Sequence, residues 1–283
     1  MASVTCKLRS DVMQTTVEVQ LYFPTDLPAE VGNDVKGVIT LLHGFTNCGD
    51  SWMQMTAAQR YAADNGLVLI APDCDNSFYQ DMKYGGAYHT FVTQELPDQL
   101  SRIFRLPRER EKNFIAGLSM GGYGALYLGL SHPDLYAGCA SFSGAVDLGM
   151  MLQYGPREAL LPVFGPVFGE ELKLPESSDL YTLFEKVSKL PANRQPKIYL
   201  SNGLEDTPVY EIRRQNDRLH SVVKELPLAH YRRMEWTGVH EWNFWDRSLV
   251  YAIDYFLENG YAARKLADWR SEPTVFDGEG KNV

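Results

Sequence analysis

A serine that could act as a nucleophile lies in the stretch AGLSMGGYGAL, residues 116–126. Ser119 has Gly117 and Gly121 two residues away on either side, so the stretch fits the pattern G-x-S-x-G. An apolar run precedes the serine and a helix-like stretch follows it, which predicts a sharp turn from strand to helix. Glycine suits such a turn because a side chain there would collide with the neighbouring strand or helix. The pattern favours a nucleophile, although a motif this short also occurs by chance.

A serine nucleophile needs a general base, and the chain contains six histidines. In proteins with this turn an acid and then a histidine follow the serine along the chain, which excludes His43 and His89. A surface or helix-capping role suits His132 and His220 better. His240 lies in GVHEW, on a glycine-containing loop between the last predicted strand and a final apolar helix. We expect His240 to be the base; the alternative is a buried histidine satisfied by its neighbours.

The acid that orients the histidine is expected between the serine and the histidine in sequence. The stretch KIYLSNGLED places Glu205 and Asp206 at the end of a buried strand. Asp206 is the preferred partner, because the shorter carboxylate is the usual one at this loop and Glu205 fits a solvated turn. Asp147, which follows the apolar run AGCASFSGAV, remains a second alternative.

Two main-chain N–H groups are needed to stabilise the oxyanion that forms when a serine attacks a carbonyl. The residue after the nucleophile, Met120, is expected to supply one. The second is expected from Phe45, because the buried strand of TLLHGF ends in His43 and Gly44, and the glycine lets the backbone turn inward. The alternative is an ordinary His-Gly turn.

The elements that must position these residues alternate along the chain. Residues 15–23 alternate in polarity and predict an amphipathic strand at a sheet edge, whereas short continuous apolar runs predict strands buried on both faces. Helical spacing lies between these runs. The pattern predicts an α/β fold with a mostly parallel sheet covered on both faces. The buried runs are residues 35–44, 66–73, 113–119, 137–144 and 197–203, and the helix-like stretches include 90–105, 122–131 and 210–225.

The 283 residues are interpreted as one domain, 1–283, with an insertion at 147–196 and a frayed tail at 271–283. The insertion is rich in proline, glycine and aromatic residues. Its apolar side chains are expected either to form a wall of the substrate pocket or to cover the sheet, and Trp52 and Tyr84 are expected to border the cleft. The insertion residues in question are Leu160, Leu161, Phe164, Phe168 and Tyr181.

Composition narrows the class of protein. The formal charge is −9 and no basic run is long, which argues against a nucleic-acid partner. The residues at 1–23 do not resemble a secretory signal, and no apolar run is long enough to cross a bilayer, so we expect a cytoplasmic protein without a membrane partner. Four scattered cysteines argue against disulfides and a zinc site, and no metal or cofactor is expected. Whether the chain forms a homo-oligomer is left open.

Taken together, these motifs resemble the putative esterase family of α/β-hydrolases, which includes esterase D and S-formylglutathione hydrolases, tributyrin esterases and feruloyl or acetyl xylan esterases. The resemblance rests on LLHGFTNCGDSW, YHTFVTQELP, AGLSMGGYGAL, NGLED and GVHEWNFWD, and it covers most of the chain. It implies an α/β-hydrolase fold, a triad of Ser119, Asp206 and His240, and an oxyanion N–H from Phe45. The short segment between Asp73 and Tyr88 is similar to the lidless tributyrin-esterase branch.

The resemblance implies a serine carboxylesterase that hydrolyses short-chain acyl or aryl esters, small molecules in either case, through an acyl-enzyme. The alternatives are an S-formylglutathione-type thioesterase, an acyltransferase to an alcohol, and a non-catalytic relative that only binds. Activity is expected to fall in acid as His240 gains a proton.

Overall fold

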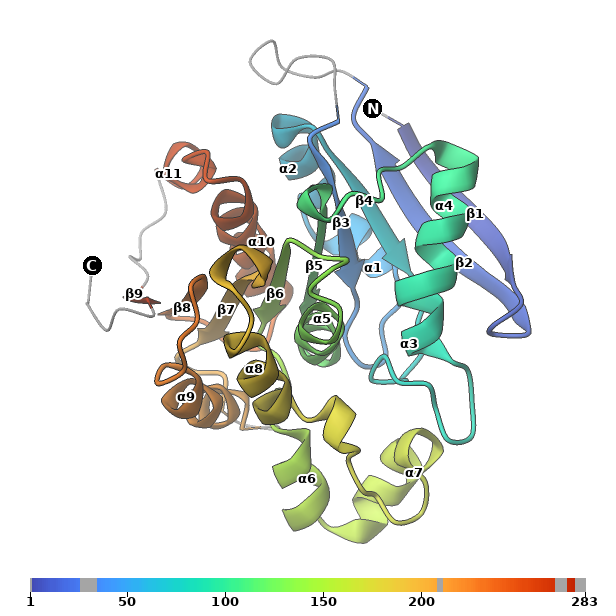
Figure 1. The fold of residues 1–283 in the computed structure, drawn as a ribbon, viewed down its shortest axis with the longest axis vertical. Coiled ribbons are helices and arrows are strands. Elements are labelled where there is room, and N and C mark those ends of the chain that lie inside the picture. Colours follow the sequence, from blue (N-terminus) through green and yellow to red (C-terminus); the bar gives the residue numbers. More distant parts are fainter. Residues whose placement is uncertain (1, 26–34, 208–210, 268–273, 278–283) are drawn as a thin grey trace.

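A computed structural model of the chain describes residues 2–25, 35–207, 211–267 and 274–277. Within these residues, nine strands form one sheet (Figure 1). From β4 to β8 neighbouring strands run parallel, whereas β1, β2 and β9 are antiparallel to their neighbours. In order across the sheet the strands are β1 (Ala2–Ser10), β2 (Thr15–Phe23), β4 (Leu67–Pro72), β3 (Gly37–Leu42), β5 (Asn113–Leu118), β6 (Gly138–Phe142), β7 (Lys197–Gly203), β8 (Tyr231–Trp236) and β9 (Thr274–Asp277).

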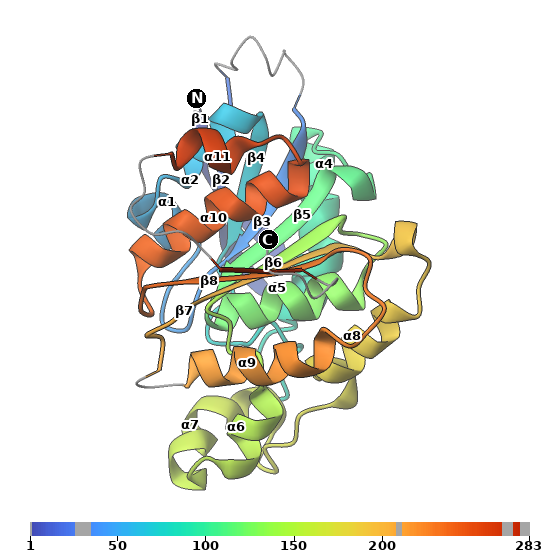
Figure 2. The same ribbon diagram turned by 90° about the vertical axis from the view of Figure 1, so that its left-hand side faces the viewer.

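The five central strands β3 to β7 are buried on both faces almost throughout, as their continuous apolar runs predict. Helices cover both faces, which confirms the predicted α/β architecture. One face carries α1 (Asp50–Met55), α2 (Ala58–Asn65), α10 (Trp242–Leu257) and α11 (Tyr261–Lys265). The other carries α3 (Tyr88–Thr90), α4 (Leu96–Phe104), α5 (Met120–Ser131), α8 (Leu180–Ser188) and α9 (Ile212–Val223) (Figure 2).

Both ends of the sheet differ from the prediction. β2 is not an edge strand, because β1 pairs with it along its full length from Ala2 opposite Phe23 to Ser10 opposite Thr15. At the other end, Thr274–Asp277 of the predicted frayed tail pairs with β8; residues 271–273 and 278–283 lie outside the described residues. Main-chain pairing needs no apolar side chains, and an unpaired strand edge exposes N–H and C=O groups. The predictions of an edge strand at β2 and of a frayed tail were therefore wrong for these residues, because both were based on side-chain type alone.

Helices α6 (Leu148–Tyr154), α7 (Arg157–Phe168) and α8 lie between β6 and β7, where the sequence predicts an insertion. The first two lie together beyond the ends of the strands, at the bottom of Figures 1 and 2. In contrast, α8 packs against α5 with Leu183 and Phe184 in the main apolar core, so it is part of the layer that covers the sheet. Of the predicted insertion at 147–196, only the part that contains α6 and α7 projects beyond the helices that cover the sheet.

One buried and three half-buried histidines make the stability of this fold sensitive to acid. Burial lowers the pKa of His43, His89 and His132, and burial together with nearby Arg233 lowers the pKa of His220 to about 4. In the unfolded chain each titrates near pH 6.5, at about the free value. Below that pH the unfolded chain binds more protons than the folded chain, so the free energy of unfolding falls as the pH falls.

We therefore expect the melting temperature to be lower at pH 5 than at pH 7, as measured by scanning calorimetry. A His220→Gln variant removes one of these groups and should show a smaller drop over the same interval. Equal slopes for the variant and the wild type would show that His220 is not one of the groups responsible.

Candidate active site

Ser119 lies at the turn from β5 into α5. Its φ of 53° and ψ of −115° lie in the left-handed half of backbone space, which a non-glycine residue adopts only under constraint. The turn is held by main-chain hydrogen bonds: the Ser119 N–H donates to Phe142 O at 2.9 Å, and its carbonyl accepts from Tyr123 and Ala145, both at 3.1 Å. The predicted turn from strand to helix is confirmed, with a half-buried serine at its tip.

The two glycines of the motif are required by close packing. A Cβ at Gly117 would lie 2.2 Å from the carbonyl oxygen of Gly121, and a Cβ at Gly121 would lie 2.2 Å from that of Leu42. Main-chain atoms cannot move aside as a flexible side chain can. The spacing G-x-S-x-G thus reflects contacts between the turn and the neighbouring β3.

The structure brings Asp206 and His240 together from separate loops. Asp206 follows β7 and is 2% exposed, and its Oδ2 lies 3.0 Å from Nδ1 of His240, which follows β8. The ring also meets the edge of Trp245, with centroids 5.0 Å apart. Because an ionised carboxylate can only accept, Nδ1 carries the proton and donates it to Asp206, which leaves Nε2 as the basic nitrogen.

The two alternative acids have other partners. Glu205 accepts the main-chain N–H of Gly238 through Oε2 at 2.6 Å. Asp147 caps α6, accepts the hydroxyl of Tyr181 at 3.1 Å and pairs with Arg218 at 3.5 Å. Neither carboxylate bonds to His240 in these contacts, so the structure favours Asp206 over both.

The peptide between Gly44 and Phe45 is oriented by His43. The Gly44 carbonyl accepts from His43 Nδ1 at 2.8 Å and from the Asn47 N–H at 3.2 Å. In a trans peptide the N–H points opposite to the C=O, so holding the carbonyl aims the Phe45 N–H the other way. A Cβ on Gly44 would lie 3.5 Å from the Ser119 Cβ, which shows how closely this loop passes the serine.

The tautomer of His43 follows from its second contact. Its Nε2 accepts the main-chain N–H of Cys74 at 2.9 Å, so the proton must lie on Nδ1, which donates to Gly44. Burial lowers the pKa of His43 and keeps the ring neutral. From the sequence, His43 was expected only to mark the turn. Its positioning contact depends on the distant Cys74, and no local signal reveals it.

Both expected oxyanion donors are available for a ligand. Met120 is the first residue of α5, where no carbonyl of the same helix lies in position to accept its N–H. Within the described part of the chain, neither the Phe45 nor the Met120 N–H donates to another protein group. The helix N-terminus adds a partial positive charge at the same place.

Ser119 opens into a cavity of about 900 Å³ that Phe45 and Met120 also line. Helices α6 and α7 form much of its apolar wall, and Glu211, Arg214 and Arg218 contribute charged groups. The apolar lining is Phe78, Ala145, Met150, Met151, Tyr154, Pro156, Ala159, Leu160, Val163, Phe164 and Ile212. The projecting helices α6 and α7 therefore cover the cavity at Ser119. The resemblance to a lidless branch did not predict such a cover.

A second cavity of about 600 Å³ shares Phe45 and Val163 with the first. Its other lining residues include Thr46, Asn47, Asp75 and Asn76, so this space is more polar. Phe45 and Val163 of α7 thus border both cavities, and the second has the larger share of polar lining.

The structure corrects the expected substrate contacts. Trp52 is 0% exposed and donates from Nε1 to the Leu42 carbonyl at 3.0 Å, inside the core on the α10 face. Tyr84 is 64% exposed and joins the end of α7 through a main-chain bond to Pro166 at 2.9 Å. Neither is among the described residues that line the serine cavity. Aromatic type and loop position did not reveal on which side of the sheet these residues lie.

The apolar residues of the insertion divide between the two expected roles. Leu160 and Phe164 line the cavity, whereas Leu161, Phe168 and Tyr181 pack against the core without lining it. Among the described residues, no group of three or more His, Cys, Asp or Glu side chains is arranged so that it could hold a metal ion. Among the helices described, none is long and apolar enough to cross a membrane.

Comparison with known proteins agrees with this geometry. A family model described as putative esterase matches residues 10–256. An acetyl esterase from Caldicellulosiruptor saccharolyticus is 28% identical over 266 residues, covering 90% of this chain and 98% of the relative. Two Staphylococcus aureus structures share the fold at 24% identity, each over 90% of this chain and 98% of the other. They are the fluorophosphonate-binding serine hydrolase FphF, with a TM-score of 0.75, and the S-formylglutathione hydrolase FrmB, with 0.71.

The fold and the serine turn define an α/β-hydrolase, as the sequence predicts. The chain belongs to the putative esterase family, since the family model spans most of its length. It is accordingly an enzyme that hydrolyses carboxylic esters, a serine carboxylesterase.

Proposed function

We propose that Ser119, His240 and Asp206 form the catalytic triad of this esterase, with the N–H groups of Phe45 and Met120 as its oxyanion hole. The observation that carries the proposal is the 3.0 Å contact between His240 Nδ1 and Asp206 Oδ2, at the same sheet edge as the constrained serine. The two unused N–H groups beside Ser119 supply the remaining requirement of acyl transfer.

The reaction proceeds in two steps. His240 Nε2 takes the proton of Ser119 as Oγ attacks the ester carbonyl, and Asp206 stabilises the imidazolium that results. The oxyanion is held by Phe45 and Met120, and His240 returns the proton to the departing alcohol. Water then attacks the acyl-enzyme by the same route and releases the acid.

The cavity that contains Ser119 is proposed to hold the acyl part of the substrate, because that part stays bonded to the serine in the intermediate. An acetyl group would fill little of a space of about 900 Å³, whereas a butyryl or aryl group would bury more apolar surface. The second cavity, which lies beyond Phe45 and has the larger share of polar lining, suits the alcohol. Within the predicted range of substrates, these cavities favour butyryl or aryl esters over acetyl esters.

The proposal is tested by measuring kcat/KM for p-nitrophenyl esters from acetate to octanoate, together with methyl ferulate and S-formylglutathione. Preference for butyrate or an aryl ester supports the carboxylesterase. Preference for S-formylglutathione would support the thioesterase alternative. New ester products on addition of alcohols would support an acyltransferase. A lack of turnover with every substrate would contradict the proposal.

A narrower cavity should change the preference for acyl length. Leu160→Trp adds a large side chain to the wall, so we expect kcat/KM for octanoate to fall at least tenfold more than kcat/KM for acetate, since loss of a well-filled apolar pocket costs a few kcal/mol. Acetate serves as the control within the same variant. Equal losses for both esters would show that this cavity does not hold the acyl group.

The subgroup, the location and self-association stay predictions. The short segment between Asp73 and Tyr88 makes the tributyrin-esterase branch the proposed subgroup, although α6 and α7 cover the serine cavity more than that branch predicts. A small-molecule ester is the partner that the proposed site requires.

A further inference from the structure

The loop that carries Asp206 is held from outside by one arginine at the start of α9. Arg213 donates from its guanidinium Nη1 to the Leu204 carbonyl at 3.0 Å, and from its main-chain N–H to the Asp206 carbonyl at 2.9 Å. The two acceptors lie on either side of Glu205. A single residue therefore fixes both ends of the three-residue segment that presents the carboxylate to His240.

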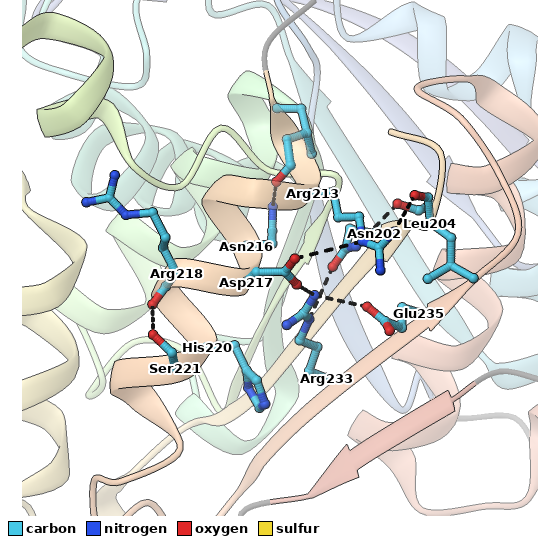
Figure 3. Close-up of polar contacts among 12 residues, drawn as sticks. Asn202, Leu204, Arg213, Asn216, Asp217, Arg218, His220, Ser221, Arg233 and Glu235 are labelled. Atoms are coloured by element: carbon cyan, nitrogen blue, oxygen red, sulfur yellow. Dashed lines mark hydrogen bonds and ion pairs between the residues drawn. The ribbon is translucent and has the colours of Figure 1, made fainter. Parts of the chain in front are cut away.

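The guanidinium of Arg213 is itself oriented by a chain of charged groups, which Figure 3 shows. Asp217, one helical turn later, lies 3.8 Å from Arg213 Nε and also pairs with Arg233 of β8. Arg233 is 3% exposed and donates to Asn202 Oδ1 of β7 at 3.2 Å and to Glu235 at 3.1 Å. Charges of opposite sign alternate along this series of side chains. The series links α9 to β7 and β8, the two strands that precede the Asp206 and His240 loops.

Glu205 ties the acid loop to the histidine loop. Its Oε2 accepts the Gly238 N–H at 2.6 Å, and its own N–H donates to the Gly238 carbonyl at 3.1 Å. Both main-chain groups of Gly238 are therefore held by Glu205, two residues before His240. The approach is close, because a Cβ on Gly203 would lie 2.1 Å from the Gly238 carbonyl.

We propose that Arg213 and Glu205 are positioning residues that set the geometry between Asp206 and His240, Arg213 by holding the acid loop and Glu205 by joining it to the histidine loop. This inference rests on the proposed function. Neither Arg213 nor Glu205 is among the residues that line the cavity at Ser119. Each side chain instead holds a main-chain group of a loop, Leu204 O for Arg213 and Gly238 N–H for Glu205. The contact between Asp206 and His240 joins two loops without regular structure, so its 3.0 Å length depends on such restraints.

Small displacements at this contact have large kinetic effects, because a misplacement of about 1 Å can cost about 100-fold in rate. Substrate binding does not involve the contact directly. Loss of either restraint should therefore lower kcat with little change in KM, which differs from loss of folded protein or loss of a substrate contact.

Arg213→Met keeps the apolar stem of the side chain and removes the guanidinium bond to the Leu204 carbonyl, while the main-chain bond to the Asp206 carbonyl remains. We expect kcat for p-nitrophenyl butyrate, per site titrated with a fluorophosphonate, to fall about tenfold with KM within about twofold of wild type. Arg213→Lys, which retains one charged donor, should recover part of the loss. Arg102→Met, at an exposed position of α4, is the matched control and should behave as wild type.

Glu205 offers a second test that does not depend on the fate of the Arg213 variant. Its side chain is exposed, so substitution should leave the fold intact. Glu205→Gln keeps an oxygen that can accept the Gly238 N–H, whereas Glu205→Ala removes it. We expect kcat to fall about tenfold in the alanine variant and within about threefold in the glutamine variant, with KM unchanged in both.

Wild-type kcat in both Arg213→Met and Glu205→Ala would overturn the inference, as would losses that appear only in KM or in the number of titratable sites. The proposed function is tested separately by Ser119→Ala. If that variant is inactive while the two loop variants match wild type, Ser119 stands as the nucleophile and only the positioning roles fail. If Ser119→Ala retains activity, the triad itself fails.

Discussion

Replacing Ser119 with alanine is expected to lower kcat/KM for p-nitrophenyl butyrate by about 10⁴-fold or more, because no other group in the proposed mechanism can form the acyl-enzyme. The substitution removes one oxygen and leaves the backbone turn in place, since that turn is held by main-chain bonds to Phe142, Ala145 and Tyr123. Thermal unfolding should therefore change little. The measurement is steady-state hydrolysis, with calorimetry on the same preparation.

Ser221→Ala is a suitable control for this experiment. Ser221 lies exposed on α9 and bonds only locally, through its hydroxyl to the Arg218 carbonyl. It should retain wild-type kcat/KM and should still react with a fluorophosphonate, whereas Ser119→Ala should not. A residual rate above about one hundredth of wild type in Ser119→Ala would mean that another nucleophile carries the reaction.

The second large effect is expected for the acid. Asp206→Asn should lower kcat by about 10⁴-fold, because the neutral amide no longer stabilises the imidazolium and can hold the ring in the wrong tautomer. Its size is nearly unchanged, so a loss of fold is not the expected cause. The measurement is kcat at a pH on the plateau of the wild-type profile.

The same substitution at Asp147 separates the two candidates. Asp147→Asn weakens the ion pair with Arg218 and keeps an oxygen that can cap α6, so it should cost little stability and change kcat by less than about tenfold. If Asp147→Asn were the inactive variant and Asp206→Asn the active one, the 3.0 Å contact with His240 would not be the functional one.

Much of the site was predictable because its requirements are local in sequence. The turn at Ser119 brings main-chain atoms so close that only glycine fits at Gly117 and Gly121, and the sequence records this as a fixed spacing. The buried parallel strands appear as continuous apolar runs for the same kind of reason, because each strand is covered on both faces. The α/β fold and the nucleophile candidate follow from such short-range patterns.

The sequence favoured Asp206 but left Glu205 and Asp147 as alternatives. All three follow a strand and differ little in local context, and only the approach of the β7 and β8 loops places one carboxylate on the ring of His240. The positioning contact of His43 likewise depends on the main chain of Cys74, 31 residues away. Partners of this kind are set by which loops meet in space.

By itself, then, the sequence determined the central buried strands, the turn at Ser119 and the candidate N–H donors of Phe45 and Met120, because each depends on residue types at fixed short spacings. The tertiary structure decided that Trp52 lies in the core, that α6 and α7 form the wall of the serine cavity, and that β1 and β9 complete the sheet. These features depend on which surfaces meet after folding. Such contacts join residues distant in sequence, and nothing in the local pattern records them.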